Sequence, residues 1–148
     1  MGYSKILVGF DGSAAADRAL SNAYDMVDHG LAERVIVLMA TDPEKTGDPA
    51  FNAAARAAGV LLSSIGDEAD ALETLRSRLG DKTRGHEDVT DLRVSFGKPH
   101  DAILSVSQQE NCGLIIMGSR GLGAVRAMLG SVSTAVLRES PIPVLVTK

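Results

Sequence analysis

Short runs of apolar residues without polar alternation recur along this chain, and stretches with helical spacing separate them. Three of these runs are Lys5–Phe10, Val35–Ala40 and Leu114–Met117. Such a run is typical of a strand that is covered on both faces, and strands that alternate with helices form parallel sheets with right-handed crossovers. The chain is therefore predicted to be an α/β protein with an open, twisted parallel sheet and helices on both faces.

The length and the charge of the chain limit the classes of protein to consider. Its 148 residues suffice for one well-filled core but not for two ordinary domains, so a single domain over residues 1–148 is expected. The 15 basic and 19 acidic residues are interspersed and give a net charge of −4. Because this distribution offers no basic stripe for a phosphodiester backbone, no nucleic-acid partner is expected.

The start of the chain shows no targeting signal, because only five apolar residues, Ile6 to Phe10, separate Lys5 from Asp11. No apolar run reaches membrane-spanning length. The single cysteine, Cys112, cannot form an internal disulfide, and its apolar neighbours predict a buried thiol in a reducing compartment. A soluble, cytoplasmic protein without membrane contact is therefore expected.

Capping residues and breaks in the pattern set the other elements. A helix is predicted from Ala14, with Ser13 as its N-cap and Gly30 at its end. In chain order the remaining elements are a polar loop at Thr41–Asn52, a mostly helical stretch from Ala53 to about Leu79 with a break near Gly59 or Gly66, an edge strand at Asp91–Phe96, a helix at Asp101–Asn111, a helix at Ser131–Glu139 and a strand at Val144–Thr147.

A glycine-rich turn, Gly118-Ser-Arg-Gly121, follows the strand at Leu114–Met117, and Gly130-Ser131 opens the helix after it. Backbone amides exposed by glycines, together with those at a helix start, form a cradle that suits phosphate. If strands one and four are neighbours where the strand order reverses, Asp11 and Gly118 face one crevice at the carboxyl ends of the strands. A nucleotide is therefore the first ligand to consider.

With those residues in hand, the whole chain resembles the universal stress protein family. The resemblance covers about residues 3–148 and depends on four separated motifs: Lys5-Ile-Leu-Val-Gly-Phe-Asp-Gly-Ser13, Gly97-Lys-Pro-His100, Ile115-Ile-Met-Gly-Ser-Arg-Gly121, and Leu129-Gly-Ser-Val-Ser133 running into Pro143-Val-Leu-Val146. Four ordered matches are far more specific than one glycine motif. The resemblance implies a Rossmann-like fold of the adenine nucleotide alpha hydrolase type, with strand order 3-2-1-4-5.

Family members that bind ATP resemble one another in a Gly-x2-Gly-x9-Gly-Ser/Thr signature. Here Gly118 and Gly121 have the family spacing, but only eight residues, 122–129, separate Gly121 from Gly130. A loop would absorb the missing residue, whereas a helical connector would turn the following amides by about 100°. Two hypotheses therefore stay open: a small ATP-binding regulator of the stress response, and a nucleotide-free homodimeric interaction module.

The resemblance implies a role for each residue of the expected nucleotide site. Asp11 would accept hydrogen bonds from the ribose hydroxyls or lie beside the adenine, and the backbone of Ala40 would meet the base. Gly118 and Gly121 would let the main chain approach the phosphates, and Arg120 would place a guanidinium on them. The implied cofactor-binding residues are Gly9, Phe10, Asp11, Ala40, Met117, Gly118, Arg120, Gly121, Gly130, Ser131, Val132 and Ser133.

The opening turn of the helix at Ser131–Glu139 would complete the phosphate site. Ser131, Val132 and Ser133 would offer backbone amides there, and the two serine hydroxyls would add donors. The cofactor implied by the resemblance is ATP, with ADP or AMP as alternatives and Mg²⁺ accompanying ATP.

The sequence contains no catalytic or metal-binding constellation. The Walker lysine signature, a Gly-x-Ser-x-Gly motif and a recognisable Ser, His and Asp triad are all missing. None of the three histidines has a second histidine or a cysteine at metal-ligand spacing. The resemblance allows slow ATP hydrolysis or self-phosphorylation on Ser131, Ser133 or Thr134, but no general base is evident, so no enzyme activity is assigned.

The final strand, Val144–Thr147, is apolar and is expected at an edge of the sheet. An exposed edge invites pairing with a second copy of the chain. Family members resemble this chain in dimerising through the last strand, so a homodimer through Val144–Thr147 is predicted, alongside a protein partner that the sequence does not identify. The alternative is that the loop at Thr41–Asn52 covers this edge.

Overall fold

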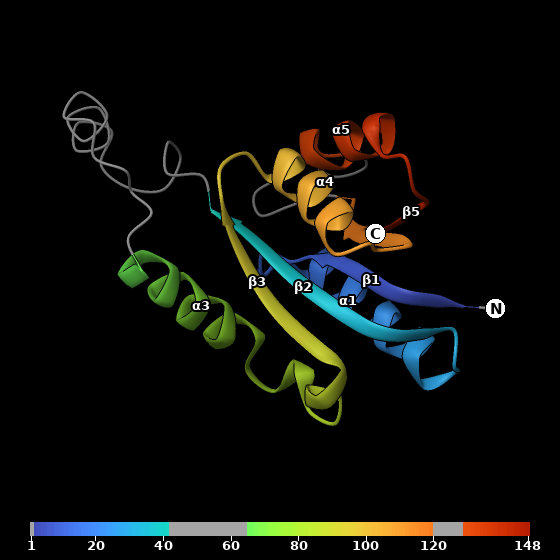
Figure 1. Ribbon diagram of the computed structural model, residues 1–148, viewed down its shortest axis with the longest axis horizontal. Helices are drawn as coiled ribbons and strands as arrows, with labels where there is room; N and C mark the ends of the chain where they lie inside the picture. Colours follow the sequence, from blue (N-terminus) through green and yellow to red (C-terminus); the bar gives the residue numbers. More distant parts are fainter. Residues whose placement is uncertain (1, 42–64, 120–128) are drawn as a thin grey trace.

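A five-stranded parallel sheet forms the centre of the protein (Figure 1). The computed structural model describes residues 2–41, 65–119 and 129–148, without the side chains of 65–67. The sheet has the order β3-β2-β1-β4-β5, so the predicted order 3-2-1-4-5 and the α/β class are confirmed. The strands are β1 (Tyr3–Gly9), β2 (Ala32–Thr41), β3 (Thr90–Phe96), β4 (Leu114–Gly118) and β5 (Val144–Thr147).

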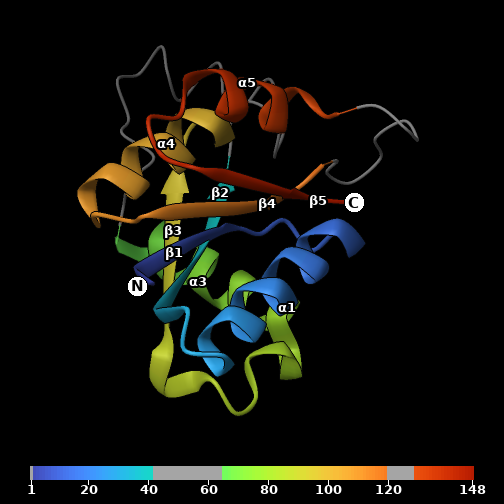
Figure 2. The ribbon, with the colours of Figure 1, turned by 90° about the vertical axis from the view of Figure 1, so that its right-hand side faces the viewer.

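Helices cover both faces of this sheet. Those described are α1 (Ala14–Asp28), α3 (Ile65–Leu79), α4 (Pro99–Gln109) and α5 (Ser131–Glu139), with two short 3-10 helices, η1 (Gly80–Thr83) and η2 (Glu87–Val89). Figure 2 shows α1 and α3 on one face and α4 with α5 on the other. The strand order reverses between β1 and β4, which places the ends of these two strands side by side.

The unbroken apolar runs are explained by two separate cores. In β1, Ile6 and Val8 pack into the cluster under α1 and α3, whereas Leu7 packs into the cluster under α4 and α5. All three side chains are fully buried. Burial of each such side chain contributes about 1.5–3 kcal/mol. Each of these three positions must therefore be apolar, which removes the alternation that a half-exposed strand would show.

The first helix begins and ends as its sequence predicts. The Ser13 side chain caps α1 by accepting a hydrogen bond from the Ala16 amide at 3.1 Å. Gly30, just after the helix, has φ of +72°, a conformation that L-residues rarely adopt. Along the helix, the side chains at Ala16, Ala19, Leu20 and Ala23 are buried against the sheet.

Several element boundaries differ from the sequence prediction, and β2, for example, begins at Ala32 rather than at Val35. Helix α4 begins at Pro99 rather than at Asp101, because proline is tolerated at the first position of a helix, where its missing amide costs nothing. Strand β3 begins one residue early, at Thr90, and lies at the sheet edge as predicted. The predicted loop at Thr41–Asn52 lies outside the described residues beyond Thr41, as do residues 53–64 of the predicted helical stretch. Within the described ranges, no helix is both long and apolar enough to cross a membrane.

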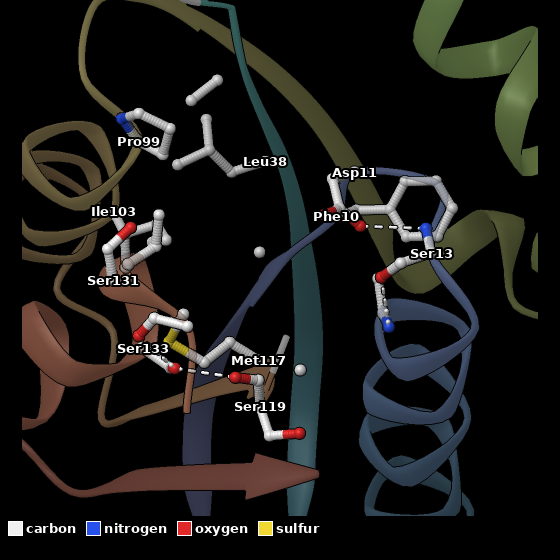
Figure 3. A pocket seen from close by; sticks show the side chains of 16 residues that line it. Phe10, Asp11, Ser13, Leu38, Pro99, Ile103, Met117, Ser119, Ser131 and Ser133 are labelled. Carbon is white, nitrogen blue, oxygen red and sulfur yellow. Dashed lines mark hydrogen bonds between the residues drawn. The ribbon is translucent and has the colours of Figure 1, made fainter. Parts of the chain in front are cut away.

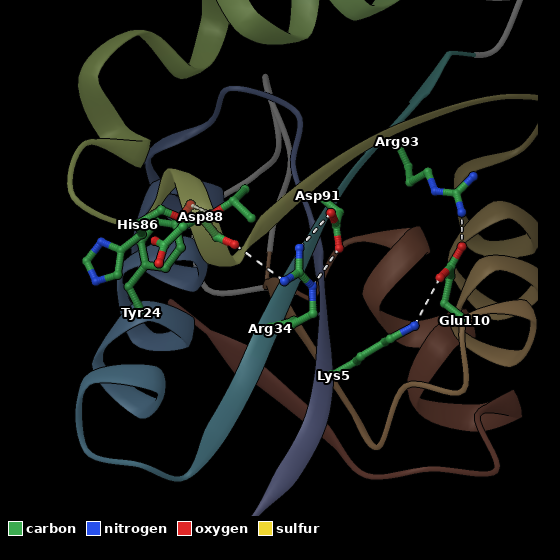
Figure 4. A network of polar contacts seen from close by, with 9 residues as sticks. Lys5, Tyr24, Arg34, His86, Asp88, Asp91, Arg93 and Glu110 are labelled. Atoms are coloured by element: carbon green, nitrogen blue, oxygen red, sulfur yellow. Dashed lines mark hydrogen bonds and ion pairs between the residues drawn. The ribbon is translucent and has the colours of Figure 1, made fainter.

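Charged side chains are paired with one another near the amino ends of the strands (Figure 4). Arg34 on β2 donates two hydrogen bonds to Asp91 on β3, with N···O distances of 3.0 and 2.9 Å. Glu110, at the end of α4, accepts hydrogen bonds from Lys5 and Arg93. These pairs connect β1, β2, β3 and α4 at this end of the sheet.

An aromatic pair lies at the same end of the sheet. The Tyr24 and His86 rings are stacked with centroids 4.1 Å apart and an interplanar angle of 7°. The Thr90 hydroxyl donates to the His86 carbonyl oxygen, so the Tyr24 hydroxyl donates to the Thr90 Oγ1 at 2.7 Å. Burial raises the pKa of Tyr24 above its ordinary value. The pair fastens η2 and the start of β3 to α1.

Candidate functional site

A pocket of about 290 Å³ lies at the carboxyl ends of the strands, where the strand order reverses between β1 and β4. Ligands bind at this place in open α/β sheets. The described site residues that the sequence predicts all line this pocket: Gly9, Phe10, Asp11, Ala40, Met117, Gly118, Gly130, Ser131, Val132 and Ser133. Arg120 and Gly121 lie outside the described residues.

The walls of the pocket differ in polarity (Figure 3). Pro99 and Ile103 from α4 lie on one side, and Leu38 from β2 lies to the right of Pro99 in this view. Asp11 and Ser13 lie on the opposite side, at the start of α1. The pocket therefore combines an apolar wall, which suits a flat ring, with a carboxylate across from it.

A tight loop between β1 and α1 presents the carboxylate. Asp11 Oδ1 accepts a hydrogen bond from the Ser13 amide at 2.9 Å, and Gly12 between them has φ of +87°. Ser13, not Asp11, is the N-cap of α1. The cap role that an isolated aspartate at this position would have is therefore already filled. A carboxylate has about four acceptor sites, so Asp11 keeps capacity for a ligand beyond its bond to Ser13.

The opening turn of α5 is fixed against the end of β4. The Gly130 amide donates to the Ser119 carbonyl oxygen at 2.6 Å, a bond that joins the two sides of the shortened connector. The amides of Ser131, Val132 and Ser133 come next, and the first N–H groups of a helix have no partner within it. Because Gly130 has no side chain to cap them, these amides stand at the pocket without a side-chain cap.

The hydroxyl of Ser133 has a different role from the one that the resemblance implies. It donates to the carbonyl oxygens of Ser119 at 2.9 Å and Gly130 at 3.0 Å, and the residue is buried. Its single proton is therefore already committed, and the expectation that it adds a donor for phosphate is corrected. Ser133 instead holds the start of α5 in place, as the dashed line in Figure 3 shows.

Glycine is needed at position 118 for a physical reason other than the expected one. A Cβ atom added there would lie 2.7 Å from the Ala15 Cβ and 3.1 Å from the Ala15 carbonyl carbon. Real Cβ atoms do not approach other atoms so closely, and here the neighbour is the backbone of α1. Gly118 is therefore required for close packing of α1 on β4, whereas the sequence-based expectation assigned the free space beside it to phosphate.

The last strand is connected directly to the pocket. The Ser119 amide donates to the Thr147 carbonyl oxygen at 2.6 Å. The Thr147 hydroxyl donates to the carbonyl oxygen of Ala15 at 3.0 Å, with Met117 O within 3.3 Å. A change at the pocket that displaced Ser119 would therefore reach the edge of the sheet through one hydrogen bond.

Sequence reasoning missed part of the apolar wall and the polar rim. The additional lining residues are Ser13, Ala16, Leu38, Pro99, Ile103 and Ser119. A signal was present for several of them. Leu38 precedes Ala40 by two residues and shares its face of the strand, and Ile103 follows Pro99 by one helical turn. Ile103 lies within the predicted helix, but the sequence did not show that this helix borders the pocket.

Metal ligands and the cysteine thiol are the remaining groups to place in the described part of the chain. No group of three or more His, Cys, Asp or Glu residues there could hold a metal ion. Cys112 is buried, as predicted, and burial raises the pKa of its thiol above the ordinary value. A thiol of this kind is protonated at neutral pH and is a poor nucleophile.

Comparison with known proteins identifies sequence relatives over the full length. The model of the universal stress protein family matches residues 2–148. The chain is 34% identical over 148 residues to a Thermus aquaticus protein, the universal stress protein in the QAH/OAS sulfhydrylase 3′ region. The match covers 99% of this chain and 99% of that relative.

Solved structures share the fold. The Methanocaldococcus jannaschii protein MJ0577 is 27% identical with a TM-score of 0.76, over 100% of this chain and 97% of that one. A universal stress protein in complex with cAMP is 23% identical with a TM-score of 0.66, and the match covers 100% of this chain and 98% of that one. The universal stress protein from Archaeoglobus fulgidus in complex with dAMP is 22% identical with a TM-score of 0.57, and the match covers 100% of both chains. Because the last two structures are less than 25% identical to this chain, their similarity shows a shared fold and nothing more.

Proposed function

Because the chain belongs to the universal stress protein family, we propose that it is a cytoplasmic regulator that binds an adenine nucleotide, ATP in the first place, in the pocket between β1 and β4. The observation that carries this proposal is that the uncapped start of α5 and the Asp11 carboxylate line the same pocket. Structures of the same fold in complex with cAMP and with dAMP support an adenine nucleotide as the ligand class.

The phosphates would lie against the start of α5. The amides of Ser131, Val132 and Ser133 supply donors without partners in the helix, and the helix dipole adds partial positive charge at this end. Gly121 and the Arg120 guanidinium are also proposed to contact the phosphates. Any Mg²⁺ would be bound by the phosphates of ATP rather than by a cage of protein carboxylates.

The nucleoside would lie across the rest of the pocket. Leu38, Pro99 and Ile103 offer an apolar wall to the adenine ring, with Ala40 beside them. Asp11 lies opposite, and its carboxylate would accept hydrogen bonds from the ribose hydroxyls. Gly9, Phe10 and Met117 also line the pocket.

Titration of the purified protein with ATP, ADP and AMP in a calorimeter tests the proposal. Binding with a preference for more phosphates is expected, because the helix start acts on negative charge. The nucleotide released into the supernatant by heat-denaturing freshly purified protein is the second measurement. Absence of heat at millimolar ATP, together with a supernatant free of nucleotide, would reject the proposed ligand.

A single backbone donor can be removed without breaking the helix. Ser131 is the first residue of α5, where proline is tolerated, and Gly130 before it has φ of −67° and ψ of 163°, which suits a residue that precedes proline. Ser131→Pro should weaken ATP binding by about 10- to 100-fold, as expected for one lost hydrogen bond to a charged group. Ser131→Ala keeps the amide and should bind nearly as the wild type does.

The second candidate function is the nucleotide-free homodimeric module, and one observation favours dimerisation. Leu145 on the edge strand β5 is 42% exposed and Leu137 on α5 is 43% exposed. Pairing of two β5 strands would cover the open edge. Light scattering at micromolar concentration should give a dimer mass for the wild type and a monomer mass for Leu145→Lys. A monomeric wild type would reject the dimer.

Nucleotide binding and dimerisation are compatible, because the hydrogen bond between Ser119 and Thr147 connects the pocket to the edge strand. We propose that nucleotide occupancy changes the surface that the protein presents to its partner along this route. A dimer whose supernatant contains no nucleotide and that gives no heat with ATP would favour the nucleotide-free module.

A further inference from the structure

Two cations, Arg78 in α3 and Lys82 in η1, lie near the loop that carries Asp11. Arg78 lies in the last turn of α3, and its Nη1 donates to the Asp11 carbonyl oxygen at 3.1 Å. Lys82, one turn later, lies 2.9 Å from the Asp17 carboxylate and 5.6 Å from the centre of the Phe10 ring. Arg78 therefore bridges α3 to the loop between β1 and α1, and Lys82 bridges η1 to Phe10 and to the first turn of α1.

Arg78 also contacts Gly12, the next residue of this loop. Gly12 adopts φ of +87° and has no side chain, and the nearest side-chain atom to its ideal Cβ position is the Arg78 Cδ, at 3.5 Å. The Arg78 stem thus packs along Gly12 while its guanidinium holds the preceding carbonyl. A hydrogen bond from a charged donor is stronger than one between neutral groups.

The orientation of the Asp11 peptide determines where its carboxylate lies. The Arg78 guanidinium fixes the carbonyl, and the bond from the Ser13 amide fixes Oδ1. With both ends held, the Asp11 side chain is ordered before a ligand arrives, so binding does not have to order it. Arg78 does not itself line the pocket, so its effect on a ligand passes through Asp11.

We infer that Arg78 is a positioning residue for nucleotide binding, which orders the Asp11 loop so that the carboxylate meets the ribose hydroxyls. This inference rests on the proposed nucleotide site. It assigns to the end of α3, on the face opposite α4 and α5, a part in ligand recognition that no motif of the sequence suggested.

The test compares Arg78→Met with Arg76→Met, an exposed residue of the same helical turn that loses the same charge. Calorimetric affinities are measured for ATP and for 2′,3′-dideoxy-ATP, which lacks the ribose hydroxyls. Arg78→Met should weaken ATP by about three- to tenfold, the range of one modest hydrogen bond, and should leave dideoxy-ATP unchanged. Arg78→Lys keeps a donor and should recover part of the ATP affinity. Arg76→Met should match the wild type with both ligands.

If dideoxy-ATP binds too weakly to measure, a second pair of variants gives the same answer. In an Asp11→Ala background, Arg78→Met should cause no further loss of ATP affinity, because the group it positions is gone. Without ligand, hydrogen exchange of the Ser13 amide should be faster in Arg78→Met than in Arg76→Met. Urea denaturation of each variant establishes that it is folded.

The outcomes separate the inference from the proposed function. A wild type that binds neither ligand rejects the nucleotide site and the inference together. A wild type that binds ATP while Arg78→Met binds it equally well rejects the inference alone. Equal losses for ATP and dideoxy-ATP, or a further loss in the Asp11→Ala background, would mean that Arg78 loosens the whole site or contacts phosphate, and would also overturn it.

Discussion

The two ends of the sheet differ in whether their polar groups have partners within the protein. At the amino ends of the strands, Arg34 and Asp91 pair with each other, and Glu110 accepts from two cations. At the carboxyl ends, the first amides of α5 follow a residue with no capping side chain and line a pocket. Figures 3 and 4 show the two ends from close by.

This difference separates stability from binding within one small fold. Groups that satisfy one another hold elements together but have little left for a ligand, whereas donors at an uncapped helix start cost stability until something binds them. Changes at the amino ends should therefore alter unfolding without altering affinity. Changes at the carboxyl ends should do the reverse, except where a pocket residue also packs the core.

Gly118 is the position where one substitution should alter both stability and affinity. It is also the position where the largest effect is expected. Gly118→Val forces branched carbons into the space of Ala15 and should lower the free energy of unfolding by about 1–3 kcal/mol or more. Urea denaturation measures this loss. Nucleotide affinity should fall as well, because α1 and the Asp11 loop would shift.

Gly9→Ala is the matched variant for Gly118→Val. Its new Cβ would lie 3.2 Å from the Ile103 Cδ1, the far end of a flexible side chain. It should narrow the pocket and weaken nucleotide binding while costing less than about 1 kcal/mol of stability, within the range of tolerated surface and packing changes. Equal destabilisation by the two variants would contradict the packing role assigned to Gly118.

Tyr24→Phe tests the amino end and should have an intermediate effect. The variant loses the hydrogen bond to Thr90 but keeps a ring to stack on His86. The free energy of unfolding should fall by about 0.5–1.5 kcal/mol. Calorimetry with ATP should give the wild-type affinity. A reduced affinity would show that the two ends of the sheet are coupled.

The smallest expected effect is a pH dependence at the amino end. The hydrogen bond from Arg34 holds the pKa of the Asp91 carboxyl below its ordinary value. The unfolded chain therefore takes up the proton first in acid, so the stability from this pair is present above about pH 4 and is lost as the pH falls through the lower folded-state pKa.

The urea midpoint should therefore fall further between pH 7 and pH 3 for the wild type than for Asp91→Asn. The difference should be small, because both side chains are largely exposed and solvent screens the pair. Arg34→Met should remove the difference as well, since it removes the donor. A wild type and an Asp91→Asn variant with the same pH response would contradict the assignment.

The elements of the fold were predictable wherever the local pattern was strong. Val144–Thr147 and Ser131–Glu139 have the predicted bounds, since each is set by glycine, proline or a change of periodicity beside it. The short helices η1 and η2 were not predicted. Their 3-10 turns span three or four residues, too few to show a periodic pattern.

The sequence also predicted ten of the residues that line the pocket, but it did not show the packing contact of Gly118 or the hydrogen bonds of Ser133. The glycine at 118 and the serine at 133 stand where the motif places them. What each side chain, or its absence, contacts is set by α1 in one case and by the Ser119 carbonyl in the other. Neither neighbour is close in sequence to the residue that it constrains, so no local pattern could reveal the contact.

By itself, the sequence determined the alternation of buried strands and helices, the parallel sheet and the end of that sheet where a ligand would bind. These follow from periodicity and chain connectivity, which are local properties. Only the tertiary structure decided that the start of α5 lies beside the end of β4, that Gly118 makes room for a helix, and that Arg78 reaches Asp11. These depend on distances between segments far apart in the chain, which packing alone sets.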